Sequence, residues 1–252
     1  MIEIQKVTKN YGSKTVVDEI TATLQEGRLT AFIGSNGAGK STLLSMISRL
    51  MKIDSGEVTI DGTNILKWNQ EELAKQISIL RQSNHMNLRL TIRELVSFGR
   101  YPYTKGRLNK EDNEKIDEAL DYTGITQIQD RYLDQLSGGQ RQMAYIAMVI
   151  AQDTKYILLD EPLNNLDMKH SVQIMKILRR LVDDRGKTVI IVIHDINFVS
   201  CYADEILALK DGKLIKAGEA EQVVNSRILS EIYSMPISIS HIDGKNICIY
   251  YT

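Results

Sequence analysis

Residues 34–42 constrain this chain more than any other stretch. They read GSNGAGKST and fit the phosphate-binding pattern G-x-x-x-x-G-K-[ST]. The apolar segment 29–33 before them predicts a buried strand, and apolar residues at helical spacing over 41–50 predict a helix. Glycine lets backbone N–H groups turn toward an anion, and a helix N-terminus adds partial positive charge. A glycine-rich turn before a helix is the simpler alternative, but the complete match in this context predicts a phosphate site.

Within this loop, Lys40 is expected to reach the terminal phosphates of a nucleotide, and Ser41 is expected to hold Mg²⁺ through its hydroxyl. The predicted nucleotide-binding residues are Gly34, Ser35, Asn36, Gly37, Ala38, Gly39, Lys40, Ser41 and Thr42.

Composition excludes some classes of protein. The chain has 252 residues, enough for one large α/β domain or two small ones. Its net charge is −1, which argues against nucleic-acid binding through a broad basic face. Cys201 and Cys248 lack metal-type spacing and are expected to be buried or incidental thiols. No signal peptide opens the sequence and no apolar run is long enough to span a bilayer, so membrane work would require another chain.

Hydrophobic periodicity predicts alternating strands and helices. The expected strands are 2–7, 16–24, 29–33, 56–62, 77–80, 156–161, 188–193, 205–209 and 213–217. The expected helices are 41–50, one from about 70, 91–98, 110–122, 141–152 and 168–184. Residues 101–106 are expected to break the helix before them. The tail should hold two short helical stretches and a hairpin of 237–242 and 246–251. Residues 83 to about 150 thus form an all-helical insertion in an α/β core.

Several polar side chains follow predicted strands directly. They are Gln82, the pair Asp160 and Glu161, and His194. In an open α/β sheet, ligands bind at the carboxyl ends of strands, so we expect these groups to converge on the phosphate loop. Asp160 can hold Mg²⁺, Glu161 can deprotonate water, His194 can bond the γ-phosphate, and Gln82 can reach the metal or water. Singly, each could be a cap or surface residue; together they predict nucleotide hydrolysis.

Three further features stand outside this set. Residues 136–140 read LSGGQ at a helix start, where unpaired N–H groups offer a second anion site. Asp167 ends a tight polar loop before a long helix. Tyr11 follows a strand, and packing is the ordinary role of such an aromatic.

Over essentially its full length, the chain resembles the nucleotide-binding subunit of ABC transporters. Residues 34–42 match the Walker A loop, Gln82 the Q-loop glutamine, 136–140 the signature, and 157–161 Walker B with its glutamate. Asp167 matches the D-loop and His194 the switch histidine. The resemblance implies a P-loop NTPase of the ABC type with a RecA-like core, an antiparallel β subdomain and a helical subdomain. It also implies core segments 1–82 and 154–220, a helical subdomain 83–153, and an extension 221–252.

The resemblance implies a shared mechanism. Two copies bind head to tail around two ATP molecules with Mg²⁺, and Tyr11 stacks on adenine. The signature residues contact the ATP of the other subunit; they are Leu136, Ser137, Gly138, Gly139 and Gln140. The pair would sit at the cytoplasmic face of the membrane on an integral permease, fed by an extracytoplasmic substrate-binding protein, with no nucleic acid involved. Residues 84–107 would dock the permease, with Met86, Leu88 and Leu90 as contacts or as packing residues.

Finer motifs narrow the transporter class. Residues 99–102, 146–153, 164–170 and 194–197 are similar to ATPases of iron(III)-siderophore importers, a subfamily shared with haem and cobalamin importers. Arg81 and Leu163 depart from the usual proline and threonine, although neither change removes a catalytic group. A soluble ABC ATPase that acts on ribosomes or nucleic acid is the alternative.

Overall fold

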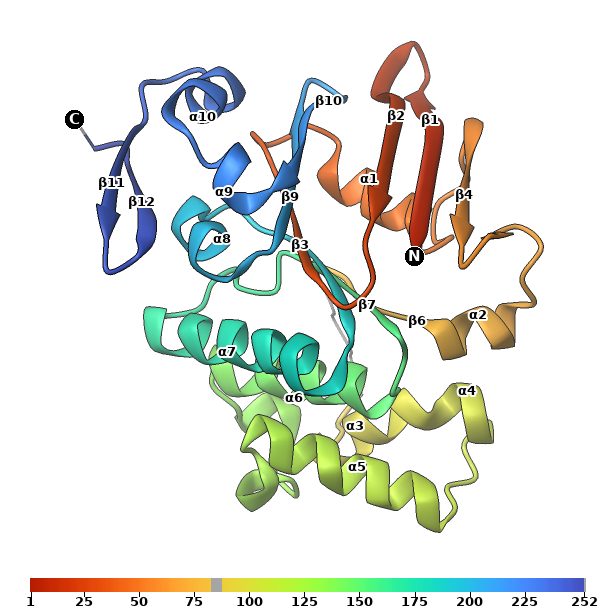
Figure 1. The fold of residues 1–252 in the computed structure, drawn as a ribbon. Helices are drawn as coiled ribbons and strands as arrows, with labels where there is room; N and C mark the ends of the chain where they lie inside the picture. Colours follow the sequence, from red (N-terminus) through yellow and green to blue (C-terminus); the bar gives the residue numbers. More distant parts are fainter. Residues whose placement is uncertain (83–87, 252) are drawn as a thin grey trace.

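A six-stranded sheet forms the centre of the molecule (Figure 1). The computed structural model describes residues 1–82 and 88–251. The strand order is β10-β9-β3-β8-β7-β6. Their bounds are β3 Leu29–Ile33, β6 Ile77–Leu80, β7 Tyr156–Asp160, β8 Thr188–Val192, β9 Glu205–Lys210 and β10 Lys213–Glu219. All pairs are parallel except β9 with β10. Every residue of β3, β7 and β8 is buried, as unbroken apolar runs predict for strands covered on both faces.

A second, antiparallel sheet lies beside the first, in the order β2-β1-β4-β5. Its strands are β1 Ile2–Tyr11, β2 Lys14–Leu24, β4 Ser55–Ile60 and β5 Thr63–Asn64. The first two strands extend further than expected, so the turn between them shrinks to residues 12–13. Helix α1, Lys40–Ile47, packs between the sheets, and its Leu43 shares a core with Ile4 of β1 and Phe32 of β3. The phosphate loop is thereby held between two sheets.

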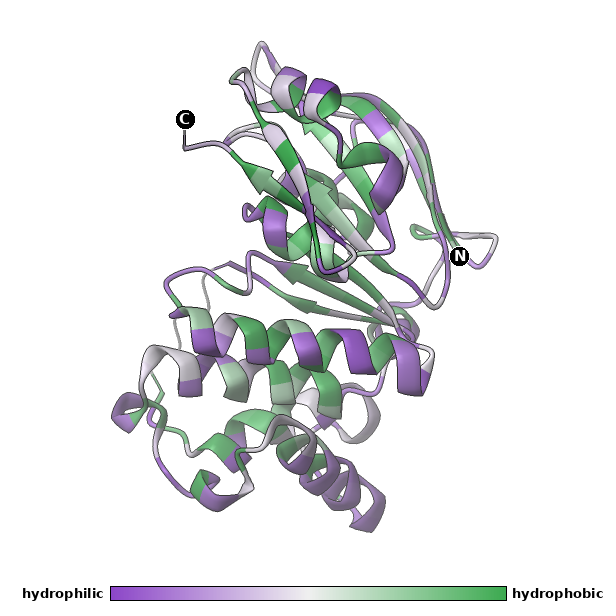
Figure 2. Cartoon of the chain, turned by 60° about the vertical axis from the view of Figure 1, so that its left-hand side comes forward, coloured by the Kyte–Doolittle hydropathy of each residue, from purple (hydrophilic) through white to green (hydrophobic). Residues whose placement is uncertain are grey.

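Helices make up the third part of the molecule, below the central sheet in Figure 1. They are α3 Ile92–Ser97, η1 Phe98–Arg100, α4 Tyr101–Thr104, α5 Lys110–Thr123, η2 Thr126–Ile128, η3 Leu133–Gln135 and α6 Gly138–Ala151. Figure 2 shows apolar and polar residues alternating along these helices, as expected where one face is buried. A capping box begins α3, with Thr91 accepting from the Glu94 N–H. Between residues 88 and 150 the structure describes no strand, apart from one isolated bridge between Thr91 and Tyr132.

The expected helix break at residues 101–106 is wrong in its position. Residues Tyr101–Thr104 form a helical turn, and the chain leaves the helix only at Lys105, which has a left-handed backbone conformation. Pro102 lies in the first turn, where proline is tolerated because its missing N–H would have no partner there. Helix α6 also begins at Gly138, three residues earlier than the predicted start at 141.

Close packing and one buried ion pair hold the helical part together. A Cβ on Gly99 would lie 2.2 Å from the Met148 carbonyl oxygen, so only glycine permits this approach of α6. The Arg100 guanidinium donates to Asp112 at 2.9 Å and to the Ala151 carbonyl at 3.0 Å. Both charged side chains are buried. The 99–102 motif therefore has a structural role in this chain.

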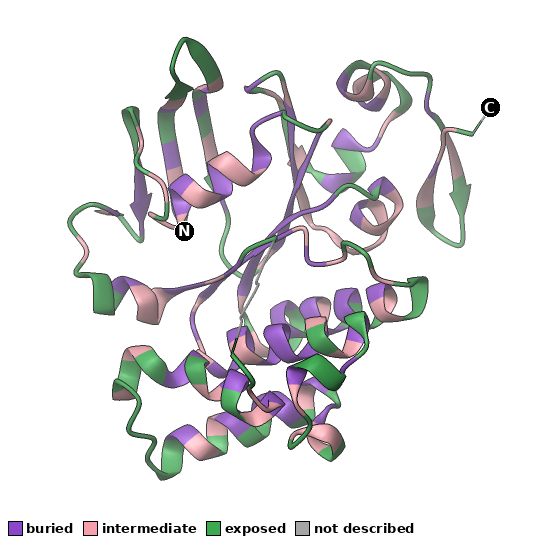
Figure 3. Cartoon of the chain, turned by 180° about the vertical axis from the view of Figure 1, so that it is seen from behind, coloured by how far each residue is buried: buried purple, intermediate pink, exposed green. Residues whose placement is uncertain are grey.

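The remaining elements complete the molecule. They are α2 Gln70–Gln76, α7 Met168–Arg185, α8 Ile196–Tyr202, α9 Ala220–Val223, α10 Ser226–Tyr233, β11 Ser238–Ile242 and β12 Lys245–Ile249. The predicted terminal hairpin is present as β11 and β12, which pair only with each other and lie at the edge of the molecule. Figure 3 shows the hairpin largely exposed or half-buried, and Cys248 is its buried residue. Among the described residues, the helices are too short or too polar to cross a membrane.

Candidate functional site

The phosphate loop joins β3 to α1 and needs glycine at two positions. A Cβ on Gly34 would lie 2.1 Å from the Leu209 carbonyl oxygen of β9. Gly39 precedes α1 with a φ of 96°, and a Cβ there would lie 2.5 Å from the Val16 carbonyl oxygen of β2. The loop backbone is thus pressed between both sheets, in a form that larger residues cannot adopt.

Lys40 is the first residue of α1 and its side chain is buried. Its Nζ donates to the carbonyl oxygens of Gly34 at 2.8 Å and Ser35 at 2.9 Å. Burial lowers the pKa of this ammonium, and the charges of Glu161 and Asp160 oppose that effect. An ammonium held by two loop carbonyls can turn to phosphate oxygens placed in the same loop.

Ser41 and Asp160 meet at the end of β7. The Ser41 hydroxyl donates to the Asp160 carboxylate at 2.7 Å. Burial raises the pKa of Asp160, and the Ser41 hydrogen bond opposes the rise. A cavity of about 180 Å³ beside them is lined by Ser41, Thr42, Ser45, Met51, Arg81, Gln82 and Asp160.

This donor set fits Mg²⁺ only in part. A hydroxyl, a carboxylate and an amide oxygen are hard oxygen ligands of the kind Mg²⁺ takes, and Mg²⁺ commonly binds through one or two carboxylates plus substrate phosphates. In the part of the chain that the structure describes, no three acidic, histidine or cysteine side chains gather as a complete metal site. The ion would therefore depend on a nucleotide to complete its shell.

Three side chains converge on Glu161, immediately after β7. Gln82 Nε2 donates to its carboxylate at 2.7 Å, and His194 Nε2 lies 2.6 Å from the other carboxylate oxygen. Asn164 Nδ2 donates to the same Glu161 oxygen as Gln82. Glu161 has a left-handed backbone with φ of 50°, which is costly for a non-glycine residue and is typical of functional sites. The structure thus joins Gln82, Glu161 and His194, as predicted, and adds Asn164, which the sequence analysis did not single out.

Tyr11 ends β1 on an open surface. Its side chain is 50% exposed and its hydroxyl donates to the Met51 sulfur at 3.0 Å. Met51 also lines the cavity beside Ser41 and Asp160. The ring is therefore accessible near the phosphate loop instead of being packed in a core.

The LSGGQ segment and Asp167 form one continuous surface. Ser137 is exposed and caps α6 by accepting from the Gln140 N–H at 3.3 Å. A Cβ on Gly139 would lie 2.4 Å from the His170 ring. Asp167 accepts from the backbone N–H of His170, and its carboxylate lies 2.8 Å from Nδ1 of the His170 ring. The backbone hydrogen bond is the main cause that lowers the pKa of Asp167. Gly139 is thus required for packing, a reason the sequence did not indicate.

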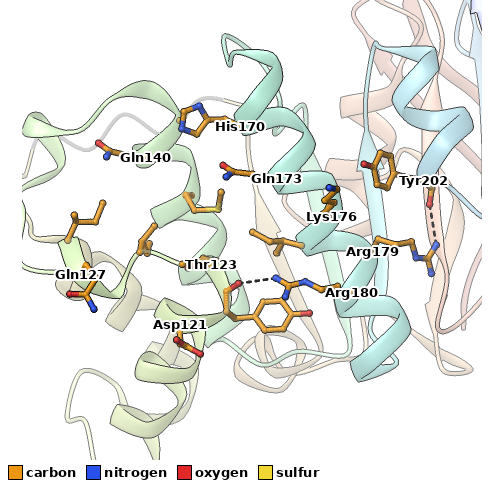
Figure 4. A pocket seen from close by; sticks show the side chains of 17 residues that line it. Asp121, Thr123, Gln127, Gln140, His170, Gln173, Lys176, Arg179, Arg180 and Tyr202 are labelled. Atoms are coloured by element: carbon orange, nitrogen blue, oxygen red, sulfur yellow. Dashed lines mark hydrogen bonds between the residues drawn. The ribbon is translucent and has the colours of Figure 1, made fainter.

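This surface is separate from the phosphate loop of the same chain. Among described residues, no hydrogen bond or ion pair joins 34–42 to 136–140. Gly139 and Gln140 line one end of a groove of about 1030 Å³ between α7 and the helical part. Figure 4 shows Gln140 and His170 at that end and Arg180 further along. The Arg180 guanidinium donates to the backbone carbonyl of Tyr122 at 3.3 Å. The two motifs open onto different depressions.

Fold and site together define a P-loop NTPase with a second motif, LSGGQ, on the surface of the helical part. The ABC transporter family matches residues 17–164, and the chain belongs to that family. It is 59% identical to the petrobactin import ATP-binding protein YclP of Bacillus subtilis over 100% of both chains. It is 40% identical to the ferric enterobactin transport ATP-binding protein FepC of Escherichia coli, over 92% of this chain and 86% of that protein.

A solved structure extends the comparison. It is a dimeric, post-hydrolysis ATP-binding cassette with ADP and Pi, 32% identical, with a TM-score of 0.77 over 87% of this chain and 99% of the other. These likenesses confirm the predicted ABC-type α/β fold, and they make this chain an ATPase subunit of a transporter.

Proposed function

We propose that this chain hydrolyses MgATP to drive import of an iron(III)-siderophore through a membrane permease. The convergence of Gln82, Asn164 and His194 on Glu161, beside the phosphate loop, carries the hydrolytic part of the proposal. The siderophore part is supported by the likeness to the petrobactin and ferric enterobactin proteins. Haem or cobalamin import remains the nearest alternative from the sequence.

The residues divide the reaction between them. The loop amides and Lys40 bind the phosphates, and Tyr11 stacks on the adenine. Ser41, Asp160 and Gln82 would hold Mg²⁺, which would supply positive charge for the transferred phosphoryl group. Glu161 accepts the proton of the attacking water, and His194 and Gln82 orient the Glu161 carboxylate. Because Lys40 and Asp160 are buried, their electrostatic interactions take place in a medium of low polarity and are stronger than they would be in water.

A second copy completes the site. We propose that residues 136–140 and Asp167 face the ATP bound by the partner, since Gly139 and Gln140 line a different depression from Ser41 and Thr42 of the same chain. ATP then favours the closed pair by contacts made only in that state. Ser137→Arg should leave ATP binding to each monomer intact and block ATP-dependent dimerisation, measured by light scattering. Ser238→Arg, at an exposed position of β11, is the control and should leave dimerisation intact. Dimerisation of the Ser137 variant as in the parent would overturn this arrangement.

The permease partner is proposed from the family. Docking would use the helical part, which the domain division places at 83–153, on the cytoplasmic face of the membrane. Leu88 is exposed and Phe98 is partly exposed there, while Leu90 packs against the main core. Met86 lies outside the described residues. An extracytoplasmic binding protein would deliver the substrate to the permease. The extension 221–252 would lie beside the nucleotide site and away from the permease.

Complementation tests the transport proposal directly. The chain is expressed in Bacillus subtilis that lacks the petrobactin import ATP-binding protein, and uptake of ⁵⁵Fe-petrobactin is measured. We expect uptake to return with this chain and not with Glu161→Gln at equal abundance. Absence of uptake with normal ATP hydrolysis would overturn the proposed role in siderophore import. Co-purification with ribosomes in place of a membrane protein would overturn the transport role.

A further inference from the structure

The C-terminal extension packs behind the catalytic loops. Lys210, the last residue of β9, donates from Nζ to the Glu231 carbonyl at 2.5 Å and to the Ser234 hydroxyl at 2.9 Å. This contact fixes the end of α10 at the strand end where Leu209 closes over Gly34. The extension is therefore anchored at the same sheet edge as the nucleotide site.

Tyr233, at the end of α10, lies against the phosphate loop. Its hydroxyl is buried and lacks a well-formed hydrogen bond to any described residue. Burial raises the pKa of Tyr233 to about 12, and the nearby backbone amide of Gly34 opposes that rise. The phenol thus fills space directly behind the first residue of the loop.

A second contact joins the hairpin to α8. The side-chain amide of Asn197 pairs with the backbone of Cys248: its Oδ1 accepts the Cys248 N–H at 2.7 Å, and its Nδ2 donates to the Cys248 carbonyl at 3.3 Å. Ser200, one turn further along α8, donates to the Asn246 carbonyl. The backbone groups of β12 that would remain unpaired at a sheet edge are thus satisfied by α8.

Helix α8 in turn sets the position of His194. Asp195 caps α8 by accepting from the N–H groups of Asn197 at 2.9 Å and Phe198 at 3.3 Å. His194 is the residue before this cap, and its Nε2 lies 2.6 Å from Glu161. Hydrogen bonds therefore join Cys248 to Asn197 and Asn197 to Asp195, and Asp195 is the chain neighbour of His194, which contacts Glu161.

We infer that the C-terminal hairpin is a positioning element for hydrolysis, acting through Asn197 and α8 to hold His194 against Glu161. This inference rests on the proposed function, because it requires His194 to assist Glu161. The Asn197 side chain bonds to Cys248 and acts on Glu161 only through α8 and His194, so it is a positioning residue. Small displacements of an orienting group slow a reaction without weakening substrate binding.

Kinetics and histidine NMR test the inference on the purified chain. Asn197→Ala removes both contacts to Cys248, and Asn197→Asp keeps only the acceptor. Ser238→Ala, on an exposed residue of β11, is the matched control. We expect kcat to fall about five-fold in Asn197→Ala and less in Asn197→Asp, with KM for ATP unchanged within two-fold. With four histidines in the chain, ¹⁵N-histidine spectra can show directly whether the His194 ring signal shifts.

Double variants separate positioning from general damage. In a His194→Ala background, Asn197→Ala should add no further loss in slow, single-turnover hydrolysis. The inference alone would be overturned if Asn197→Ala lowered activity equally with and without His194. It would also be overturned if Asn197→Ala kept full activity and an unmoved His194 signal while His194→Ala was impaired. Full activity of His194→Ala would instead overturn the role of His194 in the proposed function, and the inference with it.

Discussion

Two buried aspartates in this molecule have opposite surroundings. Asp112, in the helical part, lies 2.9 Å from the Arg100 guanidinium and also accepts the Asn109 N–H at 3.0 Å. Asp160, at the sheet edge, accepts only the neutral Ser41 hydroxyl and forms no ion pair with any described residue. The chain therefore pairs Asp112 directly with a cation, whereas the charges of Lys40 and Arg81 act on Asp160 without offsetting its burial.

The difference separates structural from functional charge. A buried carboxylate that lacks a cation costs folding free energy, whereas a paired one is balanced where it stands. The cost at Asp160 is consistent with its raised pKa, which burial causes. Retaining such a group is explained if Mg²⁺ with ATP supplies the missing charge during the reaction.

Neutralising Asp160 should have the largest effect. Asp160→Asn should lower ATP turnover about a thousand-fold, equivalent to roughly 4 kcal/mol, because an amide cannot balance the metal charge in the transition state. Phosphate release at saturating MgATP measures it. Asp61→Asn, whose carboxylate pairs with Lys155 away from the loop, is the control and should retain turnover. Near-normal turnover in Asp160→Asn would contradict a functional role for the Asp160 charge.

Removing the partner of Asp112 should have the next largest effect. Arg100→Met should lower the free energy of unfolding by about 3–5 kcal/mol, because it leaves a buried carboxylate without its cation. Urea unfolding measures this change. Lys110→Met, which breaks the exposed pair with Glu114, should leave stability unaltered within error. If Arg100→Met were as harmless as Lys110→Met, the charge pair would not be structural.

The smallest predicted effect is a gain in stability. Without nucleotide, Asp160→Asn should raise the free energy of unfolding by about 1 kcal/mol, since it removes a charge whose burial outweighs the nearby charges of Lys40 and Arg81. The folded pKa of Asp160 is raised, so its ionisation penalises folding most at high pH, and the penalty disappears as pH falls through the raised pKa. The gain should therefore shrink in urea titrations at lower pH. A gain independent of pH would have another cause.

The fold and the main site could be predicted because local patterns determine them. The phosphate loop, the apolar strands and the residues that follow them depend on short sequence segments and on the rule that parallel strands end at one edge. The predicted meeting of Gln82, Glu161 and His194 is confirmed by their hydrogen bonds. The roles assigned to these residues stay predictions.

Contacts between residues far apart in the sequence could not be predicted from it. Nothing near Asn197 in the sequence indicates that it pairs with Cys248, because 51 residues separate them. The packing of Gly139 on His170 likewise depends on how α6 meets α7. The pattern of residues 101–106 predicts a helix break, but Pro102 is tolerated in the first turn of α4, and where that helix starts depends on tertiary packing.

Glu161→Gln tests the central claim most directly, namely that Glu161 and its three donors form the hydrolytic centre of a site completed by a second copy. Light scattering and phosphate release are measured together on the variant with MgATP. The account predicts a stable dimer that retains ATP, with turnover reduced at least a hundred-fold because the amide cannot accept a proton from water. Turnover equal to that of the parent chain would contradict it.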